Sequence, residues 1–428
     1  MRIGKKIISA LLCAAIAILG AEAILQAVCL VFPRVDFVLS QAAGNQVPNV
    51  VEDAKIGFRP SAAHPDHDRN GFRNASVPDK ADVVALGDSQ TYGTGIPRKH
   101  AWPQQLARLS GLSLYNMSFG GFGPPHSLGL MDEALALKPS VILEALYSGN
   151  DLYDAYSLVH YRGKLDHLGS TDDARLQAIA AAEKREPLQK RIKRVYSMPD
   201  TTKANNPPRK HSRLVKALKK YSKLNGLFCA AYLMATRPSK PPVSAERVGR
   251  TFSLAEWEHQ LAHARRNSSR CLVYDGPKFK TLLTPLHRLA ALDLADPRIA
   301  EGMSICARAI AEMNDKTKSA GIGFAVLLIP TKEFVFRYLV YANSKSIPRV
   351  YSELIRNEAA FWRMTKEFLD SQSIPYIDVE PILRGCLDRD IQPYDITTDG
   401  HPNASGHLAI AEHLAEIVQN SGLRTRQD

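Results

Sequence analysis

The chain has few cysteines and lacks several motifs that would assign it to a common class. Its six Cys residues show no C-x-x-C spacing, which excludes a zinc ribbon and a thioredoxin-type redox motif. Disulfides among them would need an oxidising compartment, which the sequence does not decide. There is also no internal repeat and no extended low-complexity tract, which excludes solenoid and collagen-like architectures.

The positive charge is not accompanied by a nucleic-acid-binding motif. The chain of 428 residues has a formal net charge of +12, and much of the excess lies between Lys184 and Lys240. No zinc finger, recognition helix or RNP-type strand accompanies it, so we expect no nucleic-acid partner. We interpret the basic stretch as a face toward an anionic membrane or polysaccharide. The sequence does not indicate any protein partner.

The N-terminus predicts export from the cytoplasm. Three basic residues among the first six precede an apolar run from Ile7 to Ala21, as in a signal peptide, and Ala21-Glu22-Ala23 resembles a cleavage site. The longer stretch Ile7 to Phe32 is also long enough to span a bilayer. We favour an uncleaved anchor at 1–33, because the apolar character resumes after Gln26. In both interpretations the rest of the chain lies on the periplasmic side of the inner membrane, anchored or secreted.

The remainder predicts an α/β protein. Residues 34–80 form a connector rich in Pro, Asn and Asp, in which we interpret HPDHD (64–68) as a solvated loop and not a metal site. From Asp82, short apolar segments alternate with helix-length ones, which predicts a three-layer α/β/α sandwich with a mostly parallel five-stranded sheet. The expected strands are 82–87, 112–117, 140–147, 322–330 and 374–379. We assign 81–155 and 321–428 to this domain and 156–320 to a large helical insertion.

Reactive side chains follow the predicted strands. In open α/β sheets, ligands bind beyond the carboxyl ends of the strands. Gly87-Asp88-Ser89 follows the first strand, residues 116–123 (NMSFGGFG) the second, Ser148-Gly149-Asn150-Asp151 the third, and Asp399-Gly400-His401 the fifth. A hydroxyl, a glycine-rich backbone, an amide and an Asp/His pair are the components of acyl transfer.

In this order, these blocks resemble the SGNH (GDSL-type) hydrolase superfamily. The resemblance covers about 65–154 and 320–420. The stretches NGFRN (70–74) and IPTKE (329–333) are similar to membrane-anchored bacterial members, including polysaccharide O-acetyltransferases and esterases. The resemblance implies the flavodoxin-like fold of that superfamily.

The resemblance also implies residue roles. Ser89 would be the nucleophile and His401 its general base. Asp399 would hold the imidazole in the required tautomer. The oxyanion would be bound by the backbone N–H groups of Ser89 and Gly121 and by the Asn150 side chain.

One position departs from the common pattern of the superfamily. The usual Asp-x-x-His spacing would place the carboxylate at Thr398, whereas here Asp399 lies two residues before His401. Residues i and i+2 of an extended segment point to the same side, so the Asp399 carboxylate can reach the His401 ring if this segment is extended. The Asp-x-His spacing resembles some polysaccharide O-acetyltransferases of the superfamily. Asp395 is an alternative orienting carboxylate, and a Ser-His dyad is the third possibility.

Other polar residues near the expected pocket have weaker signals. Tyr92, His126 and Lys332 are candidate substrate-binding residues, with a surface ion pair between Lys332 and Glu333 as the alternative. We expect Asp88 to brace the nucleophile loop. Asn403 is a natural N-cap for a helix over 404–420.

These observations predict a serine-dependent esterase acting outside the cytoplasmic membrane, on acyl or acetyl groups of an envelope carbohydrate or lipid. The alternatives are an O-acetyltransferase of an envelope polysaccharide and a non-catalytic scaffold that kept the fold. We expect no metal and no organic cofactor. The insertion at 156–320 is a candidate for acceptor specificity.

Overall fold

The computed structural model describes residues 2–43, 45, 48–196, 221–236, 252–344 and 346–420. The chain divides into two compact units. The N-terminal unit comprises described parts of 1–51, 60–71 and 200–243, and the sheet unit comprises those of 52–59, 72–199 and 244–428. All six cysteines lie in the described parts and are unpaired.

The N-terminal unit contains three helices, α1 (Arg2–Val31), α2 (Pro33–Ala42) and α11 (Lys223–Thr236). Within α1, Ser9–Val31 is long and apolar enough to cross a membrane, with a mean hydropathy of 2.2 over its most apolar window and only 6% of that window buried. A signal sequence has the same properties. A small core of Cys29, Leu39 and Ala230 joins the three helices.

The HPDHD segment of this unit is packed, so the expectation of a solvated loop was wrong. His67 and Asp68 are both 2% exposed. His67 Nδ1 lies 2.9 Å from the carbonyl oxygen of Ser61, and Arg34 donates to the carbonyl oxygen of His67. These contacts give His67 a structural role in the unit, and Asp68 Oδ1 accepts the Asn70 N–H at 2.9 Å.

The sheet unit is built around the predicted five-stranded parallel sheet. Its strands stand in the order β4-β3-β5-β8-β9, with bounds β3 (Val83–Leu86), β4 (Leu114–Asn116), β5 (Val141–Tyr147), β8 (Gly323–Ile329) and β9 (Tyr376–Asp378). Val83 pairs with Leu114 on one side and with Val141 on the other, and Val141 pairs with Gly323. The central strands are buried on both faces, which explains why they read as continuous apolar runs.

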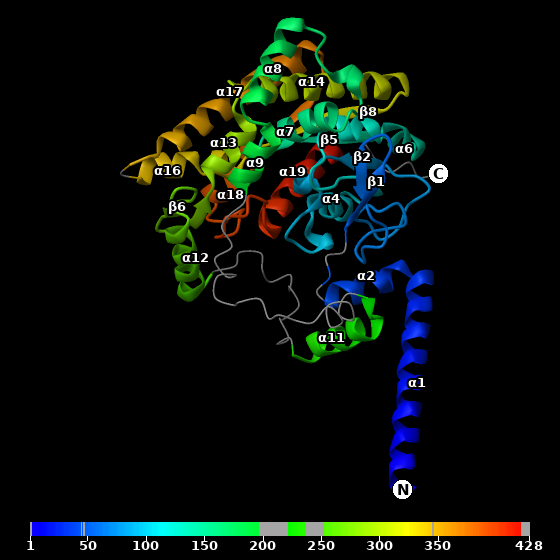
Figure 1. Cartoon of the computed structure of the whole chain (residues 1–428). Helices are drawn as coiled ribbons and strands as arrows, with labels where there is room; N and C mark the ends of the chain where they lie inside the picture. Colours follow the sequence, from blue (N-terminus) through cyan, green and yellow to red (C-terminus); the bar gives the residue numbers. More distant parts are fainter. Residues whose placement is uncertain are drawn as a thin grey trace. The chain divides into compact units, whose positions relative to one another are not determined.

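Helices cover both faces of this sheet (Figure 1). On one face α4 (Trp102–Ser110) packs against α19 (Ala404–Asn420); on the other, α14 (Pro297–Ser319) packs against α5 (Pro124–Gly129) and α7 (Asp151–Tyr156). The chain steps from β3 to β4 in one direction along the sheet and from β4 to β5 in the opposite direction. Because crossovers between parallel strands are right-handed, this change of direction places the helices that follow β4 on the other face of the sheet. The α/β sandwich predicted from the sequence is therefore confirmed.

The segment 156–320 is more varied than helical spacing predicted. It includes an antiparallel pair, β6 (Leu272–Asp275) with β7 (Lys280–Leu283), against which Trp257 packs. It also includes α14, which belongs to the layer over the sheet.

The remaining described elements of the whole chain are β1 (Val50–Asp53), β2 (Gly57–Pro60), α3 (Ser89–Tyr92), α6 (Met131–Ala136), α8 (Asp173–Arg185), α9 (Leu188–Tyr196), α12 (Leu254–Arg266), α13 (Pro285–Leu292), α15 (Lys332–Val335), α16 (Arg337–Asn343), α17 (Arg349–Ser371), α18 (Glu380–Asp388), and short helical turns at Arg98–His100, Ser157–Tyr161 and Asp166–Leu168.

Candidate active site

Ser89 begins the short helix α3 directly beyond the carboxyl end of β3. The turn between them needs Gly87, whose φ is +139°; a Cβ there would lie 2.9 Å from the Cβ of Ala145. Asp88 caps α3, because its carboxylate accepts the Gln90 N–H at 2.8 Å. Its other oxygen lies 3.2 Å from Ser89 Oγ. In the Asp-Ser pair, Asp88 therefore caps the helix, and the Ser89 hydroxyl that follows it faces the pocket.

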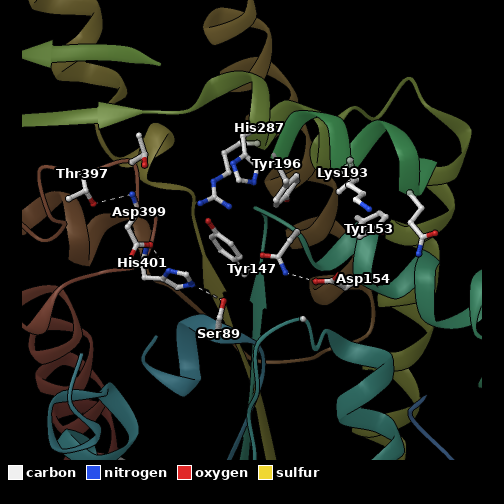
Figure 2. Close-up of a pocket in the computed structure, with 17 residues that line it drawn as sticks. Ser89, Tyr147, Tyr153, Asp154, Lys193, Tyr196, His287, Thr397, Asp399 and His401 are labelled. Atoms are coloured by element: carbon white, nitrogen blue, oxygen red, sulfur yellow. Dashed lines mark hydrogen bonds and ion pairs between the residues drawn. The ribbon is translucent and has the colours of Figure 1, made fainter. Parts of the chain in front are cut away.

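The structure brings Ser89, His401 and Asp399 together in one hydrogen-bonded series. His401 Nε2 lies 2.8 Å from Ser89 Oγ, and His401 Nδ1 lies 2.5 Å from Asp399 Oδ1 (Figure 2). The same Oδ1 accepts the His401 backbone N–H at 3.1 Å. Burial would raise the pKa of the Asp399 carboxyl, but the hydrogen bonds and charge of His401 hold it below its ordinary value. The carboxylate is thus ionised where the imidazole needs it.

Asp395 has no such geometry. It is exposed, and its backbone carbonyl accepts from Thr281 Oγ1 at 3.0 Å. Within the described residues, no bond joins its carboxylate to His401. Of the two candidate carboxylates, Asp399 is the one that contacts the His401 ring.

Gly121 and Asn150 lie in the same pocket as Ser89. Gly121 has a φ of +81°, and a Cβ on its neighbour Gly120 would lie 3.7 Å from Ser89 Cβ, so the glycine pair passes close to the hydroxyl. Asn150 precedes α7, and its Nδ2 donates to Asp154 Oδ2 at 2.5 Å. Because an amide carries two N–H donors, one remains for the pocket.

Four carboxyl groups near the nucleophile have raised pKa values; Asp88, Glu144 and Asp151 are buried, and Asp154 lines the pocket. Burial raises the pKa of Asp88 to about 6, and raises those of Glu144 and Asp154 to about 8. Asp151 is also raised by burial, and its Oδ2 accepts the Tyr147 N–H at 2.7 Å. Near neutral pH Glu144 and Asp154 are mostly protonated, whereas Asp88, which lies 3.2 Å from Ser89 Oγ, is mostly ionised. Glu144 and Asp154 therefore add little negative charge near the nucleophile.

Lys332 supports the loop 397–401, which carries Asp399 and His401 and is called the triad loop below. Its Nζ donates to the carbonyl oxygens of Thr397 at 2.7 Å and Asp399 at 2.8 Å. The residue is fully buried, and burial lowers its pKa to about 8. The expected surface ion pair is wrong, because Glu333 is also buried and accepts the Thr284 N–H at 2.7 Å.

Tyr92 and His126 stand behind the pocket. Among the described residues, the pocket lining does not include either of them or Lys332. The Tyr92 ring packs edge-on against Phe119 at 5.5 Å, and His126 stacks on Phe122 at 5.1 Å. Burial lowers the pKa of His126 to about 3. Both rings support the glycine-rich loop from behind.

The pocket has a volume of about 680 Å³, and one wall comes from the segment 156–320. Sequence reasoning missed the residues of this wall, because a helix that lines a pocket has the same spacing as one that lines a core. They are Gln189, Ile192, Lys193 and Tyr196 of α9 and His287 and Arg288 of α13. On α9 these positions follow the i, i+3, i+4, i+7 pattern of one helix face.

The helix that follows the triad loop is held in place at its start. Asn403 Oδ1 accepts the N–H groups of Ser405 at 3.0 Å and Gly406 at 3.2 Å, as expected of an N-cap. The buried His407 accepts the Trp102 N–H on Nδ1 at 3.1 Å, which ties α19 to α4. Within the described residues, no group of three or more His, Cys, Asp or Glu side chains is arranged to hold a metal ion.

Comparisons with known proteins found solved structures only, at low identity. No known protein family's profile matches the chain, and no curated protein matches its sequence. Eighteen chains of solved structures match it, including the following two. One, from Desulfitobacterium hafniense DCB-2, is described as a lipolytic protein of the G-D-S-L family; it is 11% identical, covers 79% of this chain and 99% of its own, and has a TM-score of 0.33. The other, from Bacteroides fragilis NCTC 9343, is described as an acylhydrolase; it is 11% identical, covers 83% and 91%, and has a TM-score of 0.31.

Proposed function

We propose that this chain, whose motif blocks resemble those of the SGNH (GDSL-type) hydrolases, is a serine-dependent esterase. One observation carries the proposal, namely the continuous series from Ser89 Oγ through His401 to Asp399 at the wall of a pocket. A turn serine and a structural histidine would not need this alignment.

The geometry supports a two-step acyl transfer. Ser89 Oγ attacks the ester carbonyl while its proton passes to His401 Nε2, 2.8 Å away. The resulting oxyanion points to the N–H groups of Ser89 and Gly121 and to the free Asn150 N–H; losing one such donor costs about 3–4 kcal/mol of transition-state stabilisation. The imidazolium, paired with Asp399, then protonates the leaving alcohol. Water, activated in turn by His401, hydrolyses the acyl-enzyme.

The test is labelling of the detergent-solubilised full chain with a fluorophosphonate probe, beside turnover of 4-nitrophenyl acetate. Ser89→Ala and His401→Ala should abolish both signals. Ser371→Ala changes an exposed helix-end serine whose hydroxyl bonds only the Phe368 carbonyl oxygen and the neighbouring Gln372 side chain, and should leave both intact. A folded wild-type protein that neither labels nor turns over an ester would favour a non-catalytic scaffold.

O-acetyl transfer is the second candidate, favoured by the Asp399–His401 contact in an Asp-x-His segment. A transferase would share the chemistry up to the acyl-enzyme, and its acceptor would occupy the wall formed by α9 and α13. Release of 4-nitrophenol that stays slow until a deacetylated envelope glycan is added would identify transfer. Equal rates with and without glycan would identify hydrolysis.

We further propose that α1 anchors the enzyme in the inner membrane with the sheet unit on the periplasmic side. The apolar composition of Ser9–Val31 and its exposure within the N-terminal unit support this. The chain should stay in the membrane fraction after a carbonate wash, and protease added to spheroplasts should digest it.

A further inference from the structure

The wall of the pocket contains a buried arginine with unused hydrogen-bond donors. Arg288, on α13, is 8% exposed. Within the described residues its side chain makes no hydrogen bond, its Nε is buried without a partner, and Glu333 Oε2 lies 3.9 Å from that Nε. Its guanidinium also lies 5.6 Å from the centre of the Tyr147 ring. Burying a charged group without hydrogen bonds is costly, so this arrangement points to a missing acceptor.

The guanidinium lies directly beside the triad loop. A Cβ on Gly400 would be 2.1 Å from Arg288 Nη2, so the cation passes against the backbone of the residue before His401. His401 protonates the leaving oxygen in the proposed reaction. A group that contacts Arg288 therefore belongs to the alcohol part of the ester.

Further donors surround the same space. The hydroxyls of Tyr147 and Tyr196 and the Nε2 of His287 are buried and have no partner among the described residues. The rings of Tyr196 and His287 lie 3.5 Å apart between their centres (Figure 2). Burial, with the nearby charge of Arg288, lowers the pKa of His287 to about 3, so its ring is neutral and still offers one N–H. Lys193 adds a second cation to the lining.

The acidic groups nearby are already engaged or neutral. Asp399 is bonded to His401, and Asp154 accepts from Asn150 and is protonated near neutral pH because burial raises its pKa to about 8. Among the described residues, Glu333 is the only carboxylate within 4.0 Å of the Arg288 guanidinium, and its Oε1 already accepts the Thr284 N–H. An Arg–Glu pair formed for stability would close to hydrogen-bond distance, usually with two parallel bonds.

We propose that this wall binds an oxyanion group, a carboxylate or phosphate, on the alcohol part of the ester substrate. The inference rests on the proposed esterase or transferase function and names its substrate class. The planar guanidinium offers two parallel N–H donors that match either group, and the two tyrosine hydroxyls and His287 complete the set. The natural substrate is then an ester of an acidic alcohol, such as an acylated acidic sugar.

The experiment compares three acetate esters on the full-length protein, 3-acetoxybenzoate, 3-acetoxyphenyl phosphate and the neutral 3-acetoxybenzamide. Wild type should prefer at least one anionic ester over the amide by about 10- to 100-fold in kcat/KM, the range expected for charge-assisted hydrogen bonds. Arg288→Gln should reduce that ratio to about 1, and Arg288→Lys should lower it less. Arg194→Gln, on an exposed face of α9 outside the lining, should keep it.

Two results would overturn the inference. One is Ser89-dependent turnover of the neutral ester with no wild-type preference for either anion. The other is an Arg288→Gln protein that loses all three activities equally, which would assign Arg288 to holding the triad loop. If Arg288→Gln does not fold, the wild-type preference still decides, and Tyr196→Phe, which removes only a hydroxyl, should lower the ratio. Absence of any Ser89-dependent turnover would instead refute the proposed function.

Discussion

Asp399→Asn is the substitution that separates a triad from a dyad. In the structure one oxygen, Oδ1, accepts both the ring N–H of His401 at 2.5 Å and its backbone N–H at 3.1 Å. Asparagine can keep this oxygen in place, so the loop should keep its shape. What is lost is the negative charge opposite the imidazolium that forms during catalysis.

The magnitude follows from these two contacts. If the asparagine oxygen keeps its place, the loss is that of a charge-assisted hydrogen bond, about 1.5–3 kcal/mol or about 10- to 100-fold in kcat. If the amide turns its NH₂ toward the ring, His401 is held in the wrong tautomer and the loss rises to about 10⁴-fold. Asp399→Ala should lower kcat by an amount between these two values, and should also loosen the triad loop.

The assay is single-turnover release of 4-nitrophenol, with thermal unfolding measured alongside. Asp395→Asn is the matched control, because that exposed carboxylate forms no bond with His401 in the described residues, and it should change the rate less than about 3-fold. An Asp399→Asn protein within 3-fold of wild type would refute the triad and establish a Ser-His dyad. A large loss in Asp395→Asn alone would show that the loop rearranges when substrate binds.

Three further changes test other parts of the structure. Lys332→Met removes two hydrogen bonds to the triad loop and should lower kcat about 10- to 100-fold. The control Lys366→Met breaks a surface ion pair and should leave kcat unchanged. Equal losses of kcat in the two variants would refute a positioning role of Lys332. Glu144 is buried with its pKa raised from 4.5 to about 8, so the folded state keeps a proton that the unfolded chain loses, and stability falls as pH rises from about 4.5 to 8. Glu144→Gln should therefore raise the free energy of unfolding by up to about 4 kcal/mol at pH 8 and by much less at pH 4.5; a pH-independent difference would contradict this. Glu22 accepts the N–H groups of Lys223 and Leu224 at the start of α11. In the detergent-solubilised chain, Glu22→Ala should therefore speed proteolysis of α11, and unchanged digestion would show that this contact does not hold α11.

The sheet could be predicted because its strands are short apolar runs buried on both faces. β5 and β8 begin and end within one residue of the expected bounds, since Val, Ile and Leu in parallel strands leave little choice of structure. The motif residues could be located for the same reason: each follows a strand, and parallel strands end at one edge.

The pocket wall and the buried charges could not be predicted. Lysine is almost never fully buried, so nothing in IPTKE indicated that Lys332 would lie under the triad loop. Arg288 lies in a helix whose apolar spacing indicates only packing. The β6–β7 pair was missed because its strands are four residues each and lie between helical patterns. These features depend on tertiary contacts between segments that are distant in sequence.

The separation of Ser89 and His401 along the chain has a consequence for when activity arises. They are 312 residues apart, and the histidine is fixed only when α19, the last described helix, packs against α4, one of the first of the sheet unit. At about 5–20 residues per second, synthesis leaves roughly 15–60 s during which the nucleophile exists without its base. On the proposed function and export, a polypeptide in transit through an export channel would therefore not react with the esters it passes. Activity would begin only after Ser89 and His401 have both reached the compartment in which the chain folds.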